Sequence, residues 1–416
     1  MLRLPSNRFK STGKDDTMNI LAAQSGGPTA VINATLAGII EGGKASGAAK
    51  IYGARHGIEG VMSRELVDLT HLTADEIMLL KKTPGSALGS CRHRLPEDFS
   101  HEDYIKIEKA VNGLGIDIFL YIGGNDSMDT VDKLSRYFEA KNAAVRIVGV
   151  PKTIDNDLIG TDHAPGFGSA AKYLAVTMGE MIRDTAVYNA ENVLIVETMG
   201  RNAGWLTLAA GFPYFLGSES PDIILLPEIP FDEDGFTKEL KRVLTLKKRA
   251  IVVASEGLKD PDGQYVQPDA NQLDVFGHVQ LSGVGNAIEH LIKTRIGCKT
   301  RVVEPNILQR CGAHLVSLTD LNESVEIGRA AVKAAVNGHT GIVMGFKRVS
   351  DKPYRIEIIE NKAADVANRE KKVPKEWFDL RDANVKKAVL AYLLPLIQGS
   401  VEPEYDENGL PKHFVV

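Results

Sequence analysis

The sequence has little cysteine, no excess of basic residues and no long apolar stretch. Its three cysteines, Cys91, Cys298 and Cys311, are too few and too scattered among 416 residues for a disulfide framework or a zinc site. No uninterrupted apolar run approaches the roughly 20 residues that a membrane span requires. Lysine and arginine number 49 against 54 aspartates and glutamates, and this weak acidity argues against nucleic acid as the main partner.

Residues 1–17 also lack the apolar centre of a secretory signal, because they are polar and mixed in charge. We interpret them as a loose arm ahead of the folded chain. The scarcity of cysteine agrees with the cytoplasm as the expected compartment. The remaining composition, 44% apolar and 25% charged, is typical of a globular chain that is long enough for two domains.

What the sequence does contain is an alternation of strand and helix signals. Short apolar, β-branched runs predict strands at 18–23, 116–122, 145–150, 192–197, 222–226 and 250–254. Segments with helical spacing separate several of them, so the pattern predicts an α/β fold of doubly wound, mainly parallel sheets. Further signals predict a helix at 324–337, two strands at 340–346 and 354–359 that could form a hairpin, and a packed helix at 385–397.

The stretch 148–160 carries the densest chemistry of the chain. A predicted strand is followed within a few residues by Lys152, Thr153, Asp155 and Asp157. The carboxyl end of a parallel strand is where open α/β sheets bind ligands. Two carboxylates beside a lysine suit proton abstraction next to a charge clamp. A solvated, Asx-rich turn has the same composition, so these residues alone leave both interpretations open.

Two other predicted strands end in glycine turns. Gly26 and Gly27 precede a helix expected near residue 30, whose free N–H groups could receive a phosphate, although these residues alone slightly favour a tight structural turn. The turn 123–128 contains Asp126. Mg²⁺ prefers sites of this kind, with one or two carboxylates and substrate phosphates.

A basic loop spans residues 81–92. Lys81, Lys82 and Arg92, with Arg94 just beyond, could clamp an anion. The alternative is a surface loop with ordinary charges.

Taken together, these motifs resemble the 6-phosphofructokinase family over residues 18 to about 345. The order and spacing of several pieces agree with that family, although each piece alone is a weak signal. The pieces are Ser25-Gly-Gly27, Leu88-Gly-Ser-Cys-Arg92, Gly123-Gly-Asn-Asp-Ser127, Thr153-Ile-Asp-Asn-Asp157, Met199-Gly-Arg201, Glu256, Thr300-Arg301 and Gln309-Arg310.

The resemblance implies a role for each matching residue. Asp155 would be the general base that takes the proton from the 1-hydroxyl of fructose 6-phosphate. Arg301 and Arg310 would grip the 6-phosphate, since guanidinium groups pair well with phosphate oxygens. The other implied contacts to the sugar phosphate are Thr153, Asp157, Met199, Gly200, Arg201, Glu256 and Ile307, the last standing where ATP-using relatives carry a histidine. The implied contacts to the phosphoryl donor are Gly26, Gly27, Arg92, Asp126 and Lys152.

Two departures from the ATP-using members of the family indicate the donor. Asp126 and Lys152 each stand where those members carry glycine, which leaves room for the α-phosphate and ribose of a nucleotide. A carboxylate at 126 would repel that phosphate, and Lys152 would bind the leaving phosphate of a shorter donor. Both changes are typical of the pyrophosphate-dependent branch. The magnesium contact is implied at Asp126, with the neutral Asn125 at the family's usual carboxylate position.

The resemblance therefore implies a reversible transfer from pyrophosphate to fructose 6-phosphate, which yields fructose 1,6-bisphosphate and phosphate with the help of Mg²⁺. The implied division of the chain is a phosphofructokinase-like pair of domains, with 18–167 and 309–360 for the donor, 168–308 for the sugar, and a C-terminal helical extension at 361–416. A homodimer or homotetramer is expected. Two alternatives stay open: an ATP-dependent phosphofructokinase, and a catalytically silent regulatory subunit.

Overall fold

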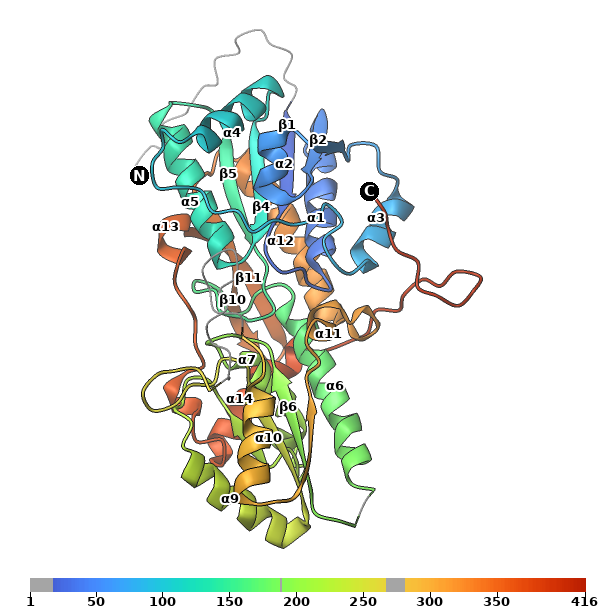
Figure 1. The fold of residues 1–416 in the computed structure, drawn as a ribbon. Coiled ribbons are helices and arrows are strands. Elements are labelled where there is room, and N and C mark those ends of the chain that lie inside the picture. The colour runs from blue at the N-terminus through green and yellow to red at the C-terminus, as the bar shows by residue number, and fades with distance from the viewer. Residues whose placement is uncertain (1–17, 188, 267–280) are drawn as a thin grey trace, which may run out of the picture.

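The computed structural model describes residues 18–187, 189–266 and 281–416, so the predicted arm at 1–17 lies outside the described residues. Figure 1 shows two α/β lobes, one above the other, with helix α6 (Phe167–Thr185) leading from the first lobe along the second. Each lobe has its own sheet. None of the helices in the described ranges has the length and apolarity of a transmembrane span.

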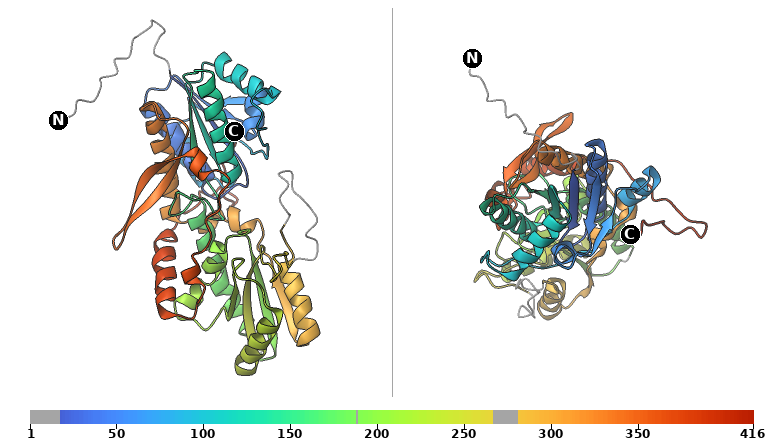
Figure 2. Two further views of the ribbon diagram at one scale, coloured as in Figure 1. Left: turned by 90° about the vertical axis from the view of Figure 1, so that its left-hand side faces the viewer. Right: turned by 90° about the horizontal axis from the view of Figure 1, so that it is seen from above.

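The first lobe is built on a seven-stranded sheet in the order β11-β10-β5-β4-β1-β2-β3. The inner strands pair in parallel, whereas the edge strands β3 and β11 pair antiparallel to their neighbours. The predicted hairpin is confirmed by β10 and β11, which lie at an outer edge of this lobe (Figure 2). The strands are β1 (Asn19–Gln24), β2 (Lys50–Ala54), β3 (Leu66–Asp68), β4 (Ile118–Gly123), β5 (Arg146–Pro151), β10 (Ile342–Asp351) and β11 (Tyr354–Lys362).

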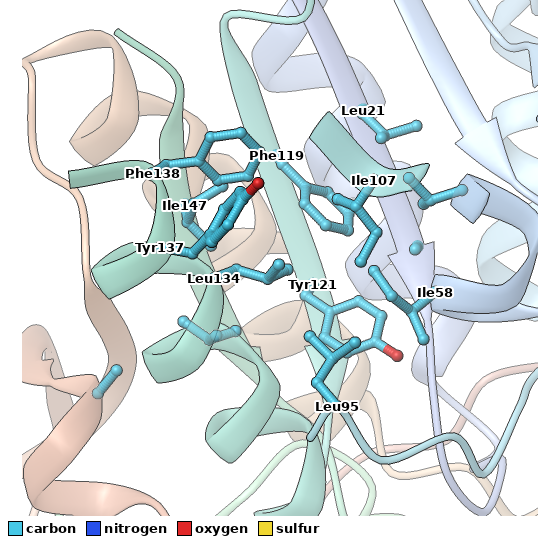
Figure 3. Packing of buried hydrophobic residues seen from close by; sticks show 14 of the residues in the cluster. Leu21, Ile58, Leu95, Ile107, Phe119, Tyr121, Leu134, Tyr137, Phe138 and Ile147 are labelled. Atoms are coloured by element: carbon cyan, nitrogen blue, oxygen red, sulfur yellow. The ribbon is translucent and has the colours of Figure 1, made fainter. Parts of the chain in front are cut away.

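Helices cover both faces of this sheet, as the alternating pattern predicted. Along β1, Leu21 and Ala23 belong to one apolar core (Figure 3), and Ile20 and Ala22 belong to the core on the opposite face, because successive strand residues point to opposite sides. The first core is covered by α2 (Gly57–Ser63), α4 (Glu102–Gly113) and α5 (Asn125–Ala140), and the second by α1 (Ile32–Ala45), α3 (Ala74–Lys82) and α12 (Leu318–Val336).

Helix α12 begins before the predicted residue 324. The side-chain oxygen of Ser317 accepts the backbone N–H of Asp320 and so caps the helix start. The periodic apolar residues that prompted the prediction begin only one to two turns later, and the prediction therefore missed the first turns of the helix.

The second lobe contains a parallel four-stranded sheet in the order β7-β8-β6-β9. Its strands are β6 (Asn192–Thr198), β7 (Ile223–Leu225), β8 (Arg249–Ser255) and β9 (Lys299–Val303). The remaining helices are α7 (Trp205–Ala210), α8 (Phe212–Phe215), α9 (Glu233–Lys247), α10 (Val284–Arg295), α11 (Leu308–Cys311), η1 (Ala313–Leu315), α13 (Ala363–Val366), η2 (Lys375–Trp377) and α14 (Ala383–Leu396).

The end of the chain connects the two lobes. After β11, the chain passes α13 on the first lobe and then descends to α14 on the second (Figure 1). Helix α14 confirms the predicted helix at 385–397, and its Val389 and Leu393 are buried in the same core as α6 and α7. Between α13 and η2 lie residues 368–373, which we call the crossing segment.

Candidate active site

The turn after β5 brings a buried lysine and two carboxylates to the carboxyl end of the first sheet. Lys152 is 3% exposed, and its Nζ donates to the carbonyl oxygen of Gly27 at 2.7 Å. The backbone N–H of Asp155 donates to Thr153 Oγ1 at 3.1 Å. The chain then reverses at Asn156, whose φ of 55° lies in the left-handed region that asparagine tolerates better than most residues. This arrangement excludes the solvated surface turn that the sequence alone left open.

The two carboxylates of this turn both have raised pKa values, but the charges around them differ. Burial, followed by the charge of Asp155, raises the pKa of Asp157 to about 7. Burial also raises the pKa of Asp155, but the nearby cations Arg201, Lys152 and Arg310 oppose this effect. Like charges so close together disfavour double ionisation, and the cations favour the charge on Asp155. Asp155 is therefore the better candidate for a proton acceptor.

The glycine turn after β1 leaves room for two cations. A Cβ atom on Gly26, whose φ is +75°, would lie 3.2 Å from Lys152 Nζ, and a Cβ atom on Gly27 would lie 2.9 Å from Arg310 Nη1. Burial lowers the pKa of Lys152 to about 8, and burial together with the charge of Arg92 lowers the pKa of Arg310. Three neighbouring cations, of which Lys152 is buried, suit an anion of high charge, such as a phosphate.

The turn after β4 presents oxygen atoms at the start of α5. Asp126 Oδ1 accepts from Arg94 Nη2 at 2.7 Å. Asn125 Nδ2 donates to the carbonyl oxygen of Arg369 at 2.6 Å, whereas Asn125 Oδ1 is buried and has no hydrogen-bond partner among the described residues. A helix N-terminus favours phosphate. A buried amide oxygen that needs a partner, next to a carboxylate, is also suited to a cation.

These turns enclose one cavity of about 780 Å³. All five predicted donor-binding residues line it, as do residues of the turn at 151–157, which we call the catalytic turn, of the second lobe and of the crossing segment. The lining residues are Ser25, Gly26, Gly27, Arg92, Arg94, Gly124, Asn125, Asp126, Ser127, Lys152, Thr153, Asp155, Asp157, Arg201, Asn202, Tyr265, Leu281, Asn368, Glu370 and Lys372.

Three predicted sugar-binding residues do not line the cavity but fix the turn that carries Arg201. Glu256 Oε1 accepts the backbone N–H groups of Gly200 at 3.2 Å and of Arg201 at 3.1 Å, and burial raises its pKa to about 8. The backbone N–H of Met199 donates to Gln309 Oε1 at 3.1 Å. Met199, Gly200 and Glu256 thus shape the turn that presents Arg201, which lines the cavity itself.

The structure does not bring two other predicted sugar contacts into this cavity. Arg301 lies on the edge strand β9, with Nη1 3.9 Å from Asp184 Oδ2, and lines a separate hollow of about 180 Å³ together with Asn192. Ile307 precedes α11 and is 54% exposed. The expected pairing of Arg301 with Arg310 on one phosphate is therefore not present within one chain, since only Arg310 reaches the glycine turn.

The predicted anion clamp is wrong for its two lysines. Lys81 Nζ lies 2.7 Å from Glu41 Oε1, and Lys82 Nζ lies 3.4 Å from Glu404 Oε1. Both lysines are on the last turn of α3, away from the cavity lining, whereas Arg92 and Arg94 follow in the loop and do line it. The predicted loop at 81–92 therefore begins too early, because its first two residues belong to α3.

Sequence reasoning missed the contribution of the crossing segment. Asn368, Glu370 and Lys372 line the cavity, although they lie more than 200 residues beyond the catalytic turn. Their polar side chains in a charged run look like an ordinary solvated stretch. The only available signal was their alternate spacing, which is typical of an extended strand with one face toward the site.

The carboxyl ends of parallel strands thus present a buried lysine, a helix N-terminus and a proton acceptor around one cavity, which arginine side chains also line. These features define an α/β enzyme of the phosphoryl-transfer class. The family described as Phosphofructokinase matches residues 19–335. The chain belongs to the phosphofructokinase family.

Individual relatives agree with this assignment. The chain is 41% identical to a pyrophosphate–fructose 6-phosphate 1-phosphotransferase of Xanthomonas campestris pv. campestris, over 95% of each chain. It is 37% identical to the enzyme of the same name from Methylococcus capsulatus, over 96% of each chain. Among solved structures, the pyrophosphate-dependent phosphofructokinase from Marinobacter aquaeolei is 34% identical, with a TM-score of 0.83 over 95% of each chain. The predicted phosphofructokinase-like α/β fold is confirmed.

Proposed function

We infer that this protein transfers a phosphoryl group reversibly from pyrophosphate to the 1-hydroxyl of fructose 6-phosphate, and so acts in glycolysis or gluconeogenesis. Support comes from the names of relatives that match nearly the whole chain. The structural observation that carries the inference is the position of Lys152, whose ammonium group lies on the donor turn at Gly27. A short donor of high charge fits this arrangement.

In the forward reaction, Asp155 accepts the proton of the sugar 1-hydroxyl. The freed oxygen attacks the terminal phosphorus of pyrophosphate, the bridging P–O bond breaks, and phosphate leaves with the electron pair of that bond. Lys152, Arg92 and Arg310 stabilise the charge that gathers on the phosphoryl oxygens. Arg201 and Thr153, which line the same cavity, orient the sugar phosphate.

Asp126 and Arg94 support pyrophosphate over ATP as the donor. Their ion pair of 2.7 Å lies on the cavity lining, where a nucleotide would need space for its α-phosphate. The carboxylate of Asp126 would repel that phosphate, and Arg94 holds the carboxylate in place. The alternatives, an ATP-dependent enzyme or a silent regulatory subunit, are not favoured, because the donor-side substitutions and the catalytic Asp155 are both present.

We also propose Mg²⁺ as the cofactor, held by Asp126 and Asn125. In the described ranges, no three histidine, cysteine, aspartate or glutamate side chains gather around a common point. This agrees with Mg²⁺, which commonly takes only one or two protein ligands and completes its shell with water and phosphates. The unpartnered Asn125 Oδ1 fits such a role. Bound there, the ion would neutralise charge on the donor phosphates.

We propose the domain division inferred from the sequence, with 18–167 and 309–360 for the donor, 168–308 for the sugar and 361–416 as an extension. We further propose that Arg301 serves the sugar phosphate of a neighbouring subunit in a homodimer or homotetramer. Support comes from its place on an edge strand, outside the cavity of its own chain.

The direct test offers the purified protein fructose 6-phosphate and Mg²⁺, with either pyrophosphate or ATP, and measures fructose 1,6-bisphosphate. We expect turnover with pyrophosphate to exceed turnover with ATP at saturating concentrations. A preference for ATP would overturn the donor assignment, and inactivity with both donors would favour the regulatory subunit.

A further inference from the structure

The crossing segment, residues 368–373, is bonded to three parts of the candidate site: the start of α5, the second lobe and the turn after β5. Its side chains alternate: Asn368, Glu370 and Lys372 line the cavity, and Val373 is buried on the other side. Lys371, between the lining residues, points its ammonium group into the interior, where burial lowers its pKa to about 8. The segment therefore behaves as a short strand laid across the site.

On the donor side, the segment is bonded to the start of α5. The carbonyl oxygen of Arg369 accepts from Asn125 Nδ2 at 2.6 Å, and Asn368 Nδ2 donates to Asp129 Oδ1 at 2.9 Å. Asn125 belongs to the turn that we propose to hold Mg²⁺. One end of the crossing segment thus fixes the turn after β4.

Other bonds tie the segment to the second lobe. Glu370 Oε1 accepts from Asn202 Nδ2 at 3.3 Å, next to the turn that presents Arg201. The carbonyl oxygen of Lys371 accepts from Trp205 Nε1 at 3.0 Å, and Val373 donates its N–H to Glu228 Oε1 at 2.9 Å. The segment therefore joins the sugar-binding lobe to the donor side.

The bonds to the catalytic turn are the densest. The backbone N–H of Lys371 donates to the carbonyl oxygen of Asp157 at 2.6 Å, and Leu158 forms an antiparallel bridge with Glu370. Lys371 Nζ donates to Asn156 Oδ1 at 3.3 Å and to the carbonyl oxygens of Thr161 at 3.1 Å and Asp162 at 2.8 Å. The ammonium group thus connects Asn156, inside the catalytic turn, with the backbone at residues 161–162 that follows it.

Asn156 stands between the carboxylates of Asp155 and Asp157 in the turn after β5. It is fully buried, has a positive φ, and accepts the N–H of Ala164 at 3.1 Å besides the bond from Lys371. Its Nδ2 donates to the hydroxyl of Tyr392 on α14 at 2.7 Å, and that hydroxyl donates to the carbonyl oxygen of Asp162 at 2.7 Å. The conformation of this turn therefore depends on side chains from the C-terminal part of the chain.

We propose that Lys371 and Tyr392 are positioning residues for phosphoryl transfer, which hold Asn156 so that Asp155 faces the sugar hydroxyl. The inference rests on the proposed function, since it assigns the proton to Asp155. Neither residue touches the reacting atoms. Their effect on the rate comes from geometry, because a displacement of roughly 1 Å can cost about 10²-fold in a phosphoryl or proton transfer.

Two substitutions separate this role from general stability. Lys371→Met keeps a flexible, unbranched side chain of similar size and removes the ammonium group, with its three donated bonds and its contact 5.2 Å from the centre of the Trp205 ring. Tyr392→Phe keeps the ring and removes only the hydroxyl. Lys375→Met is the matched control, because Lys375 is an exposed lysine four residues further along the chain, outside the cavity lining.

The experiment measures kcat and the KM for each substrate, together with circular dichroism and thermal melting. We expect a roughly 10- to 100-fold fall in kcat for Lys371→Met and a smaller fall for Tyr392→Phe, with each KM within about threefold of the wild-type value. The control should keep the wild-type kcat. The folded signal in circular dichroism should be retained by all three variants.

A kcat within about twofold of wild type for folded Lys371→Met would overturn the proposal, as would a rise in KM that matches the fall in kcat. If Lys371→Met does not fold, Tyr392→Phe decides, and an unchanged kcat in that variant overturns the proposal. All ratios are taken with the donor that the wild type uses, pyrophosphate or ATP. A wrong donor assignment therefore shows in the wild type and leaves the ratios readable.

Discussion

The ammonium group of Lys152 lies 2.7 Å from the carbonyl oxygen of Gly27, so the turn after β5 is bonded directly to the turn after β1. In the sheet, β4 lies between these two strands. The lysine that would distinguish pyrophosphate from ATP is therefore fixed on the glycine turn, and a change at either turn should alter the choice of donor.

The first prediction concerns that choice. Asp126→Gly should allow some activity with ATP, because it removes the carboxylate that would repel the α-phosphate. Lys152→Gly should lower turnover with pyrophosphate by about 10²-fold or more, which is typical for the loss of a group that stabilises transition-state charge. The double variant should shift the ratio of ATP to pyrophosphate activity further than either change alone. Coupled assays with both donors measure this ratio.

Asp126 also has a second proposed role, as a magnesium ligand, so Asp126→Gly needs a companion. If that variant is inactive with both donors, adding Asn125→Asp should restore activity by returning a carboxylate to the turn. Two results together would contradict the roles assigned to Asp126 and Lys152. The first is that Asn125→Asp does not restore activity, and the second is that Lys152→Gly leaves the ratio of ATP to pyrophosphate activity unchanged.

The second prediction concerns the proton acceptor. Asp155→Asn should lower kcat by roughly 10²- to 10⁴-fold, which is typical for the loss of a general base, with little change in the KM for fructose 6-phosphate. Steady-state kinetics measure both constants. Asp365→Asn, at an exposed aspartate of α13, is the control and should behave as wild type. Near-normal turnover in Asp155→Asn would assign the proton to another group.

The third prediction concerns the pH dependence of kcat. The charge of Glu370 raises the pKa of both Asp155 and Asp157. Since Asp155 must be ionised to accept a proton, activity falls on the acid side, and Glu370→Gln should move this acid limb to lower pH. A pH profile of kcat for the variant and the wild type tests the direction. The same movement should not occur in Glu376→Gln, at an exposed glutamate of η2.

The fourth prediction concerns Arg301 and a shared sugar site. Arg301→Ala should raise the KM for fructose 6-phosphate more than that for pyrophosphate if its guanidinium serves a neighbouring subunit. Subunits with Asp155→Asn and subunits with Arg301→Ala, each impaired alone, should regain activity when they are mixed and reassembled, because some sites then contain both native residues. Additive, uncomplemented activities would show that Arg301 acts only within its own chain.

The fifth prediction concerns stability. His163 is buried, with Nδ1 2.9 Å from Asp162 Oδ2 and Nε2 2.7 Å from Glu323 Oε2. Burial alone would lower its pKa, but the charges of Glu323 and Asp162 outweigh that effect and raise the pKa from 6.5 to about 9. A raised pKa in the folded state stabilises the protein fully below pH 6.5, and this contribution is lost as the pH rises through 9.

The measurement for His163 is the free energy of unfolding in urea across this pH range. The difference between wild type and His163→Gln should shrink from pH 6.5 to above 9. Taking the difference removes the contributions of other groups, such as the buried lysines. Curves that stay parallel would mean that His163 does not change its charge in this interval.

The sequence was sufficient for the parallel architecture and for much of the site. Strand-end turns such as 24–27, 123–127 and 151–157 could be placed together, because the carboxyl ends of parallel strands meet at one edge of a sheet. The order of the motifs then made the family recognisable. These arguments depend only on local patterns and on a general rule of α/β sheets.

Sequence reasoning failed where a side chain depends on distant partners. Lys371 stands in a charged run that looks solvated, yet its ammonium group is buried against Asn156, 215 residues earlier. Arg301 was expected at the sugar phosphate, but its strand lies at the edge of the second sheet. Neither outcome follows from local periodicity, because both are decided by how the two lobes and the chain end pack.

The crossing segment also has a consequence for protein synthesis. A ribosome releases the three strand-end turns of the first lobe long before it reaches residues 368–373, and α14 emerges later still. The nascent chain can therefore form most of the first sheet while the catalytic turn still lacks its bonds to Lys371 and Tyr392. From the proposed roles of Lys371 and Tyr392, we expect chains that stop before these residues to transfer phosphoryl groups more slowly than chains that contain them.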